Sequence, residues 1–408
     1  MRLAGSFQLN ESVLRLGAEE AFVYLARSLE LKRKGVDVVS FGIGQPDFQP
    51  PSFVIEEAYK AMREGFNGYG PSLGMPELRE AIAEFLSEKY KVDVKPSEVA
   101  VTVGAKAAIF IGMLSLLNPG DEVIVPDPSY PLYESVARFV GARPVFLRLH
   151  RGNNYKIRYE DVERLLSDKT RMIVLNYPEN PVGTTMDRAD VEEIVELAAK
   201  RGIVVVSDEI YDHFVYEGEH FSTLQTSAWR DCVYYVNGFS KTYGMTGWRL
   251  GYVVANEKLI ERLSVVANNM YSCPPTFAQV AAARALRYGL SWFKPILEGY
   301  LRRRDLIYEK LSRIPGVKVR KPEGAFYIFP DFSEVIESMK LKSERELADR
   351  LLYEKGVVAL PGTAFPKEGG VGHLRLSFAV SEADIEKGIE RIKEWISESV
   401  SSKHEITF

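Results

Sequence analysis

The chain has little or nothing of several features that mark particular protein classes. Among its 408 residues there are two cysteines, the formal net charge is −4, and no uninterrupted apolar run is as long as a membrane span, which needs about 20 residues. A disulfide-stabilised scaffold and a membrane-spanning protein are therefore not expected. The absence of a Lys/Arg-rich run also argues against a nucleic acid or an anionic membrane surface as the partner.

The two cysteines and the first residues favour a cytoplasmic protein. Cys232 and Cys273 lie in apolar surroundings without the spacing of metal ligands, so we expect two buried free thiols and no metal site. The N-terminal residues contain no long apolar segment of the kind that directs secretion. We therefore expect a cytoplasmic globular chain, long enough to form two sizeable cores.

From about Ser97 to Ala255 the chain alternates short β-rich apolar runs with longer segments of helical period. This alternation predicts a large doubly wound α/β domain, with a mostly parallel sheet covered on both faces. Strands are expected at Val99–Val103, Glu122–Val125, Met172–Leu175, Ile203–Ser207, Val233–Asn237 and Leu250–Ala255. Helices are expected between them, including Lys106–Leu117, Leu132–Val140 and Arg188–Lys200.

After about residue 300 the pattern changes to a long charged helix followed by shorter elements. Strands are expected at Val317–Arg320, Ala325–Phe329 and His373–Phe378, and helices near Glu344–Glu354 and from Glu382. This mixture predicts a second, smaller α+β domain. The amphipathic stretch Ala18–Lys34, followed by Val36–Gly44, is expected to return the N-terminal arm to that domain.

A lysine and an arginine follow the apolar run Val233–Val236. Lys241 stands at the start of a Gly-rich loop, and Arg249 comes eight residues later. A lysine amine at the end of a strand can condense with an aldehyde, and the guanidinium fork matches a phosphate. The pair suggests a pocket for pyridoxal phosphate (PLP), although an isolated lysine and arginine are more often solvated surface residues.

The residues that follow the other strands support a ligand site, because ligands of doubly wound sheets gather at the carboxyl ends of the strands. Gly104, Ala105 and Lys106 open a helix whose first N–H groups can bind phosphate. The loop 176–183 can present the Asn180 amide inward. Asp208 ends a strand apolar enough to be buried, so its carboxylate needs a cationic partner, such as a protonated pyridine nitrogen.

These residues resemble the class I/II aminotransferases, which are fold type I PLP enzymes, and the overall similarity is greatest to archaeal-type aspartate aminotransferases. The matching blocks occur in the order of the family at Gly42–Phe48, Tyr69–Ile82, Val101–Ala107, Asp127–Tyr133, Asn176–Gly183, Ser207–Tyr211, Ser240–Gly251 and Arg375–Phe378. With the chain pattern, the resemblance divides the chain into an N-terminal arm at 1–48, a large PLP-binding domain at 49–299 and a small C-terminal domain at 300–408.

The resemblance implies a role for each matched position. Lys241 holds the cofactor covalently and moves a proton as general base and acid. Asp208 keeps the ring nitrogen protonated, Tyr211 and Asn180 bind the phenolic oxygen, and Tyr130 stacks on the ring. The phosphate-binding set is Gly104, Ala105, Lys106, Ser240 and Arg249, with the Lys106 side chain expected in solvent. The set for the substrate α-carboxylate is Arg375, Asn180 and Gly44.

Simpler readings exist for some of these residues. Tyr130, Tyr133 and Tyr211 can be ordinary half-buried or core aromatics, and Asp208 and Arg375 can be members of structural ion pairs. The chain also departs from the family at Gly238, where many relatives have a serine that binds the phosphate.

The resemblance further implies a homodimer in which Tyr69 reaches the phosphate of the neighbouring subunit, although the Gly-Pro-Ser context also allows a tyrosine packed locally in a turn. The substrates are expected to be an amino acid and a 2-oxo acid. Asn268 and Asn269 stand where some aspartate aminotransferases have an arginine for the distal carboxylate, and Ile109–Leu117 offers no cation. Arg15 in the N-terminal arm is a candidate cation for that carboxylate. We expect aspartate and 2-oxoglutarate as substrates, with tolerance of aromatic or small aliphatic amino acids.

Three functions remain open from the sequence. The first is an aminotransferase that cycles its cofactor between aldehyde and amine forms. The second is a lyase that catalyses β-elimination or cyclisation, because reaction choice depends on which substrate bond is aligned with the cofactor ring. The third, a non-enzymatic regulator, is disfavoured because the segment before Gly42 shows no basic helix-turn-helix pattern.

Overall fold

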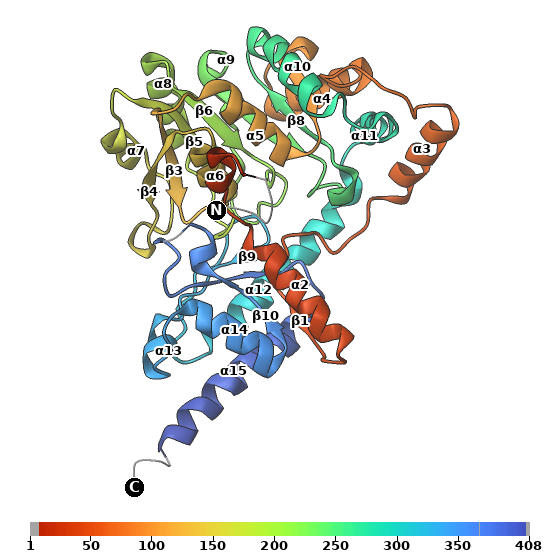
Figure 1. Ribbon diagram of the computed structural model, residues 1–408. Coiled ribbons are helices and arrows are strands. Elements are labelled where there is room, and N and C mark those ends of the chain that lie inside the picture. Colours follow the sequence, from red (N-terminus) through yellow and green to blue (C-terminus); the bar gives the residue numbers. More distant parts are fainter. Residues whose placement is uncertain (1–7, 367, 405–408) are drawn as a thin grey trace.

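A computed structural model describes residues 8–366 and 368–404, and its largest element is a seven-stranded sheet (Figure 1). Its strands are β2 (Val99–Thr102), β3 (Glu122–Asp127), β4 (Arg143–Arg148), β5 (Thr170–Asn176), β6 (Val204–Asp208), β7 (Val233–Gly238) and β8 (Gly251–Val254). They are arranged in the order β2-β8-β7-β6-β5-β3-β4. Neighbouring strands are parallel, except that β8 is antiparallel to β2 and to β7. The predicted mostly parallel sheet is confirmed, with one reversed strand.

Apolar side chains form one core on each face of this sheet. In β5, Ile173 and Leu175 belong to one core, and Met172 and Val174 belong to the other, as expected for a strand buried on both faces. The first core is covered by α4 (Pro76–Tyr90), α8 (Arg188–Arg201) and α11 (Thr276–Tyr288). The second is covered by α5 (Ala105–Leu116), α6 (Leu132–Phe139) and α10 (Glu257–Tyr271). The predicted doubly wound arrangement is therefore correct.

Shorter strands and further helices form a second layer, below the large sheet in Figure 1. The strands are β1 (Val39–Ser40), β9 (Tyr327–Ile328), β10 (Val357–Val358), β11 (Leu360–Pro361) and β12 (Leu374–Ser377). β1 pairs with β10, and β12 lies between β11 and β9. The helices are α2 (Glu20–Arg33), α12 (Lys294–Ser312), α13 (Ser333–Ser338), α14 (Glu344–Lys355) and α15 (Glu382–His404). Peripheral helices are α1 (Glu11–Leu14), α3 (Ser52–Arg63), α7 (Tyr159–Leu165) and α9 (Trp229–Cys232).

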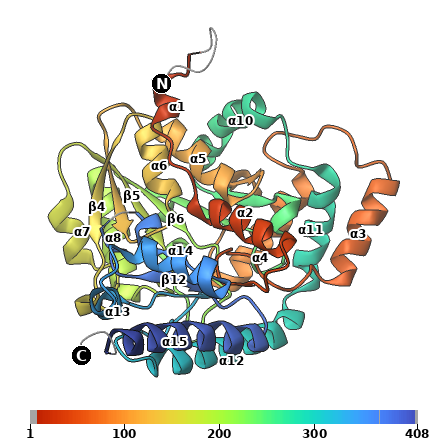
Figure 2. The same ribbon diagram turned by 60° about the horizontal axis from the view of Figure 1, so that its bottom comes forward.

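The N-terminal arm shares a core with the C-terminal elements. Tyr24, Val39 and Phe41 are buried in the same cluster as Leu311 and Leu347, and Figures 1 and 2 both show α2 beside the C-terminal helices. We propose on this basis that the arm and the C-terminal segment form one folding unit. The predicted domain boundary at 299/300 falls inside α12, so a continuous helix would connect the two proposed units.

Two expectations about local structure were wrong, and one strand of the large sheet was not among those predicted. β4 was not predicted; its Pro144 is tolerated because the strand lies at the sheet edge. The expected strand Val317–Arg320 is reduced to an isolated bridge between Lys318 and Asp331. Both cysteines are free, but Cys273 is only half buried, and its sulfur accepts a hydrogen bond from the N–H of Gly70 at 3.3 Å.

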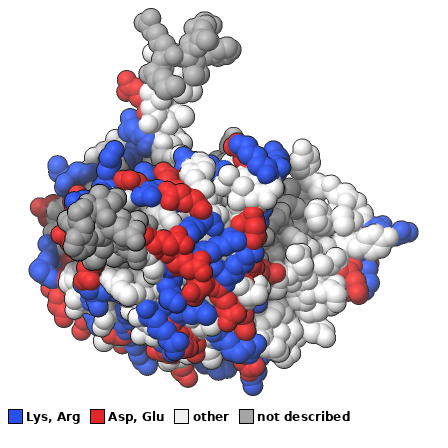
Figure 3. Space-filling model, turned by 90° about the horizontal axis from the view of Figure 1, so that it is seen from below, with Lys and Arg blue, Asp and Glu red and all other residues white. Residues whose placement is uncertain are grey.

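Charges of both signs alternate over the face formed by the C-terminal helices. Figure 3 shows Lys and Arg interspersed with Asp and Glu on that face. Ion pairs join α12 to α15 there, from Arg302 to Glu382 and from Lys310 to Glu386. Among the described residues of this face, there is no large area of one sign to attract a polyanion.

We predict that Gly251→Ala destabilises the protein. A Cβ at this position would collide with backbone atoms of Gly104 and Ala105, so β8 and the start of α5 would have to separate. Such overpacking costs about 1–3 kcal/mol, which urea unfolding of the cofactor-free protein can measure. Gly68→Ala is the control because nothing lies within 4 Å of its Cβ position. Equal stability of the two variants would contradict this reading of the contact.

Candidate active site

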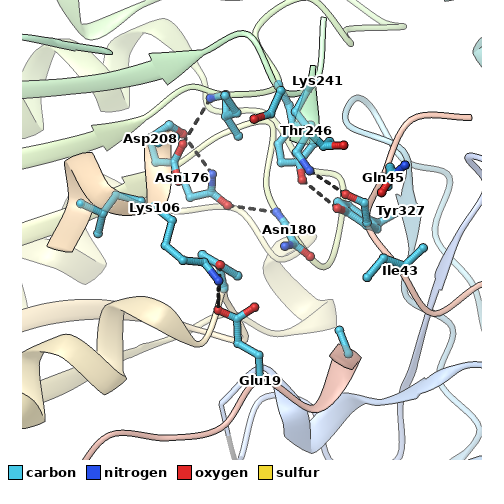
Figure 4. Close-up of a pocket in the computed structure, with 18 of the residues that line it drawn as sticks. Glu19, Ile43, Gln45, Lys106, Asn176, Asn180, Asp208, Lys241, Thr246 and Tyr327 are labelled. Atoms are coloured by element: carbon cyan, nitrogen blue, oxygen red, sulfur yellow. Dashed lines mark hydrogen bonds and ion pairs between the residues drawn. The ribbon is translucent and has the colours of Figure 1, made fainter. Parts of the chain in front are cut away.

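The strand ends of the large sheet open into a cavity of about 580 Å³, shown in Figure 4. Asn176 ends β5, Asp208 ends β6, and Ser240 and Lys241 follow β7. Arg249 precedes its strand, β8, rather than following it. Because β8 runs antiparallel to β7, the beginning of β8 lies at the same edge as the ends of the parallel strands. Arg249 therefore joins the others in one cavity.

Lys241 is held with its amine in this cavity. Its Nζ donates a 2.6 Å hydrogen bond to the carbonyl of Gly44. Burial removes water from the ammonium group and lowers its pKa to about 8, with repulsion from Arg375 adding to the effect and Asp208 opposing it. A substantial fraction of the amine is therefore uncharged and nucleophilic at mildly alkaline pH.

Asp208 is 4 % exposed and accepts a 2.7 Å hydrogen bond from the hydroxyl of Tyr133. Burial raises the pKa of its carboxyl to about 6, although the bond from Tyr133 works in the opposite direction. A cationic group beside the carboxylate would favour its ionised form. The reading of Tyr133 as a half-buried aromatic was wrong, because this residue is completely buried and holds the Asp208 carboxylate.

The first turn of α5 and Arg249 form an anion-binding corner. Gly104 is the N-cap of α5, has a positive φ of 84°, and provides no side-chain cap. The Arg249 guanidinium packs so closely against this turn that any side chain at Gly104 would collide with it. Its Nη1 donates to the carbonyl of Thr246 at 2.8 Å. Uncapped helix N–H groups, this guanidinium and the nearby Ser240 hydroxyl are suitable donors for a phosphate.

The departure at Gly238 has a steric cause. A Cβ at this position would lie 2.9 Å from the Gly251 Cα atom and 2.9 Å from the Leu250 carbonyl oxygen. The backbones of β7 and β8 approach too closely here for a serine. Ser240, which lines the cavity, can still offer its hydroxyl to a phosphate.

Arg375 provides a second anion site, separate from Arg249. The residue is 3 % exposed on β12, and its Nη1 donates to Asn180 Oδ1 at 3.2 Å, while Nη2 donates to the carbonyl of Gly42. Its Nε is buried without a hydrogen-bond partner. Burial lowers the pKa of the guanidinium from its usual value. An unpaired buried N–H is costly, and a carboxylate would satisfy it.

The small sheet contributes a tyrosine that the sequence did not single out. The hydroxyls of Tyr327 and Tyr211 lie 2.7 Å apart, and any side chain at Gly44 would collide with the Tyr327 hydroxyl. Glycine is therefore required at position 44 for this approach. Figure 4 shows Tyr327 and Asn180 on the same side of the cavity as Lys241.

The structure brings most of the predicted site residues together. Those that line the cavity are Gly44, Ala105, Lys106, Tyr130, Asn180, Asp208, Tyr211, Ser240, Lys241, Arg249 and Arg375. Gly104 does not line the cavity but lies against the Arg249 guanidinium. Tyr69 lies outside it and is 90 % exposed. Arg15 also lies outside, with its guanidinium bonded to the carbonyls of Arg138 and Phe139.

Lining residues that sequence reasoning missed include Glu19, Gln45, Asn176, Tyr133, Thr246 and Tyr327. Tyr133 and Asn176 lie within matching sequence blocks, so their positions could have indicated them. Glu19 precedes α2 and reaches the cavity only through the return of the N-terminal arm. The Lys106 side chain is partly solvated, as expected, but its amine also forms an ion pair with Glu19 at 2.5 Å, which the sequence did not indicate.

The residues present fit PLP. The Lys241 amine suits the aldehyde, the Asp208 carboxylate suits the ring nitrogen, and the uncapped turn of α5 with Arg249 suits the phosphate. The buried Nε of Arg375 remains available for a substrate carboxylate. Among the described residues, no cluster of His, Cys, Asp and Glu is suited to a metal ion.

Comparison with known proteins agrees with this fit. The family model for aminotransferase class I and II matches residues 36–392. The chain is 42 % identical to an aspartate aminotransferase of the archaeon Sulfolobus acidocaldarius, covering 96 % of this chain and 98 % of that one.

Two solved structures are also closely similar. Aspartate aminotransferase from Thermus thermophilus, determined with maleate, has a TM-score of 0.90 and 37 % identity, covering 95 % of this chain and 99 % of that one. Alanine aminotransferase from Pyrococcus furiosus has a TM-score of 0.89 and 36 % identity, covering 96 % and 100 %. Together with the cavity, these matches show that the chain belongs to the class I and II aminotransferases, the PLP-dependent transferases of fold type I.

Proposed function

We propose that this enzyme transfers the amino group of an L-amino acid to 2-oxoglutarate by a ping-pong mechanism. Aspartate is the main donor in this proposal, and aromatic amino acids and alanine are tolerated. The observation that carries it is a partly buried lysine of lowered pKa in one cavity with a buried carboxylate and two separate anion sites. The aspartate and alanine specificities named for the Sulfolobus, Thermus and Pyrococcus relatives support the range of donors.

In this proposal, Arg375 binds the substrate α-carboxylate through parallel hydrogen bonds and orients the Cα atom. When bound, PLP supplies an aldehyde that takes up the substrate amine and a ring that accepts the electron pair released at Cα. The Lys241 amine removes the proton from Cα and delivers it to the carbon that belonged to the aldehyde of the cofactor. A pKa of about 8 suits a group that must both accept and donate a proton.

The remaining site residues bind the charged and polar groups of the cofactor in this proposal. Asp208 stabilises the proton on the ring nitrogen, and Tyr133 fixes the orientation of its carboxylate. Tyr211 and Asn180 bind the phenolic oxygen, and Tyr327 positions the Tyr211 hydroxyl. Ser240, Arg249 and the turn Gly104-Ala105-Lys106 would anchor the phosphate, and Tyr130 would stack on the ring.

The lyase alternative has no support from the relatives described above, which are named as aminotransferases. A cytoplasmic location remains part of the proposal. No helix in the described part of the chain combines the length and apolar character needed to cross a membrane.

We also propose a homodimer in which Tyr69 contacts the cofactor phosphate of the partner. The exposure of Tyr69 suits a residue that acts in a neighbouring site. The loop that carries it lies against α10, since Asn268 Nδ2 donates to Ser72 Oγ at 3.0 Å. α10 also exposes Val265 and Met270, which are 59 % and 48 % accessible. Apolar side chains beside this loop favour an intersubunit surface.

Sedimentation at assay concentrations tests this arrangement. We expect a dimer. We also expect Tyr69→Phe to weaken PLP affinity while the dimer stays intact. A charge-assisted hydrogen bond is worth about 1.5–3 kcal/mol, so the loss should be at least about tenfold. Tyr59→Phe, at an exposed tyrosine on α3, serves as the control. A fully active monomer would refute the proposal.

We expect Asp208→Asn to reduce kcat far more than PLP affinity. A neutral amide cannot hold the ring nitrogen protonated, and removing one preorganised partner at a reacting centre typically costs about 10²–10³-fold. Rapid-mixing half-reactions and cofactor titration separate the two quantities. Tyr133→Phe keeps the carboxylate and should retain most of the activity. Near-normal kcat in Asp208→Asn would show that the carboxylate is structural.

The donor range is tested by mixing the enzyme with 2-oxoglutarate and aspartate, tyrosine, alanine or leucine, while products and the cofactor spectrum are followed. We expect kcat/KM for aspartate to exceed the others by less than about 10³, or roughly 4 kcal/mol, because Glu19 neutralises Lys106. Lys241→Ala should show no turnover with any donor. Elimination products instead of a new amino acid would favour the lyase.

A further inference from the structure

The cavity contains an ion pair that the proposed reaction does not use. Lys106 Nζ lies 2.5 Å from Glu19 Oε1, and the Tyr130 hydroxyl donates to the same oxygen at 3.0 Å. Figure 4 shows the Lys106 amine and the Glu19 carboxylate directed at one another. Phe22, from the first turn of α2, lies beside them, with its ring centre 5.7 Å from Lys106 Nζ.

A count of charges shows why this pair stands apart. The charged side chains that line the cavity in the described residues are Glu19, Lys106, Asp208, Lys241, Arg249 and Arg375. PLP and the substrate α-carboxylate account for Asp208, Lys241, Arg249 and Arg375. A substrate with a second carboxylate therefore finds one remaining cation, the Lys106 side chain, and that cation already has an anionic partner.

Glu19 is placed so that it can give up this contact. It is the N-cap residue of α2, but its side chain makes no capping hydrogen bond to that helix. The Glu19 side chain is 21 % exposed and that of Lys106 is 43 % exposed, so water screens the pair and can receive a displaced carboxylate. Breaking the pair thus leaves no buried charge without a partner.

We propose that Glu19 is an internal competitor for the distal acidic group of the substrate. Its carboxylate occupies Lys106 until the distal carboxylate of a substrate such as aspartate or 2-oxoglutarate displaces it. When the substrate side chain is neutral, the ion pair between Glu19 and Lys106 stays intact. The pair and Phe22 then form one wall of the cavity. Glu19 thereby lowers the preference of the enzyme for acidic over neutral substrates, but it does not exclude acidic substrates.

This inference rests on the proposed function, but it can be tested by binding alone. Isothermal titration of the PLP-loaded enzyme with succinate, which has two carboxylates, and 3-phenylpropionate, which has one, compares the two kinds of ligand. We expect Glu19→Gln to tighten succinate binding by about tenfold, equivalent to about 1.4 kcal/mol, and to change 3-phenylpropionate affinity by less than about threefold. The ratio of kcat/KM for aspartate over phenylalanine should rise in parallel.

Glu20→Gln is the matched control. It removes the same charge one residue along the chain, but Glu20 pairs with Arg345 instead of a cavity residue. Its succinate affinity should equal that of the original enzyme. In a Lys106→Gln background, Glu19→Gln should no longer tighten succinate binding, because the contested cation is gone.

Unchanged or weaker succinate binding in Glu19→Gln would overturn the inference, and so would an equal gain in Glu20→Gln. Failure of the proposed function looks different. In that case the enzyme would transfer no amino group from any donor, whatever the succinate affinities of the variants.

Discussion

The structure depends on confining several positive side chains in one cavity, where burial weakens their contact with solvent. Lys241, Arg249 and Arg375 point into one space with Asp208 as their buried counter-charge. Desolvation and mutual repulsion disfavour this arrangement without a ligand, as the lowered pKa values of Lys241 and Arg375 indicate. Anionic ligands relieve that unfavourable energy. The proposed binding of a phosphate and a carboxylate follows from this, because the fold has already placed their cations in one cavity and shielded them from solvent.

The fold achieves this through two sheets that meet at the cavity. Parallel strands of the large sheet deliver Asp208 and Lys241 from their carboxyl ends, and the reversed strand β8 adds Arg249. The small sheet contributes Arg375 and Tyr327 from neighbouring strands. Because the proposed substrate contact and the proposed cofactor contacts belong to different sheets, a relative movement of the two sheets would change the position of Arg375 with respect to Lys241.

The sequence was informative where chemistry is local to a strand end. Asp208 and Lys241 each follow a strong apolar run, and a charged residue at such a position has few structural explanations. Glu19 could not be predicted in this way, because its partner Lys106 lies 87 residues further along the chain. Tyr327 and the buried state of Tyr133 likewise depend on contacts between distant segments. Short elements such as β4 and the bridge at Lys318 are set by pairing partners rather than by their own composition.

Borohydride reduction of the PLP-loaded enzyme, followed by digestion and mass spectrometry, tests the central claim most directly. Reduction fixes the cofactor to the lysine that holds it. The account predicts that the modified peptide contains Lys241, whose buried amine has the lowered pKa that this attachment needs. Modification of Lys106, or of a lysine outside the cavity, would contradict the assignment and the mechanism built on it.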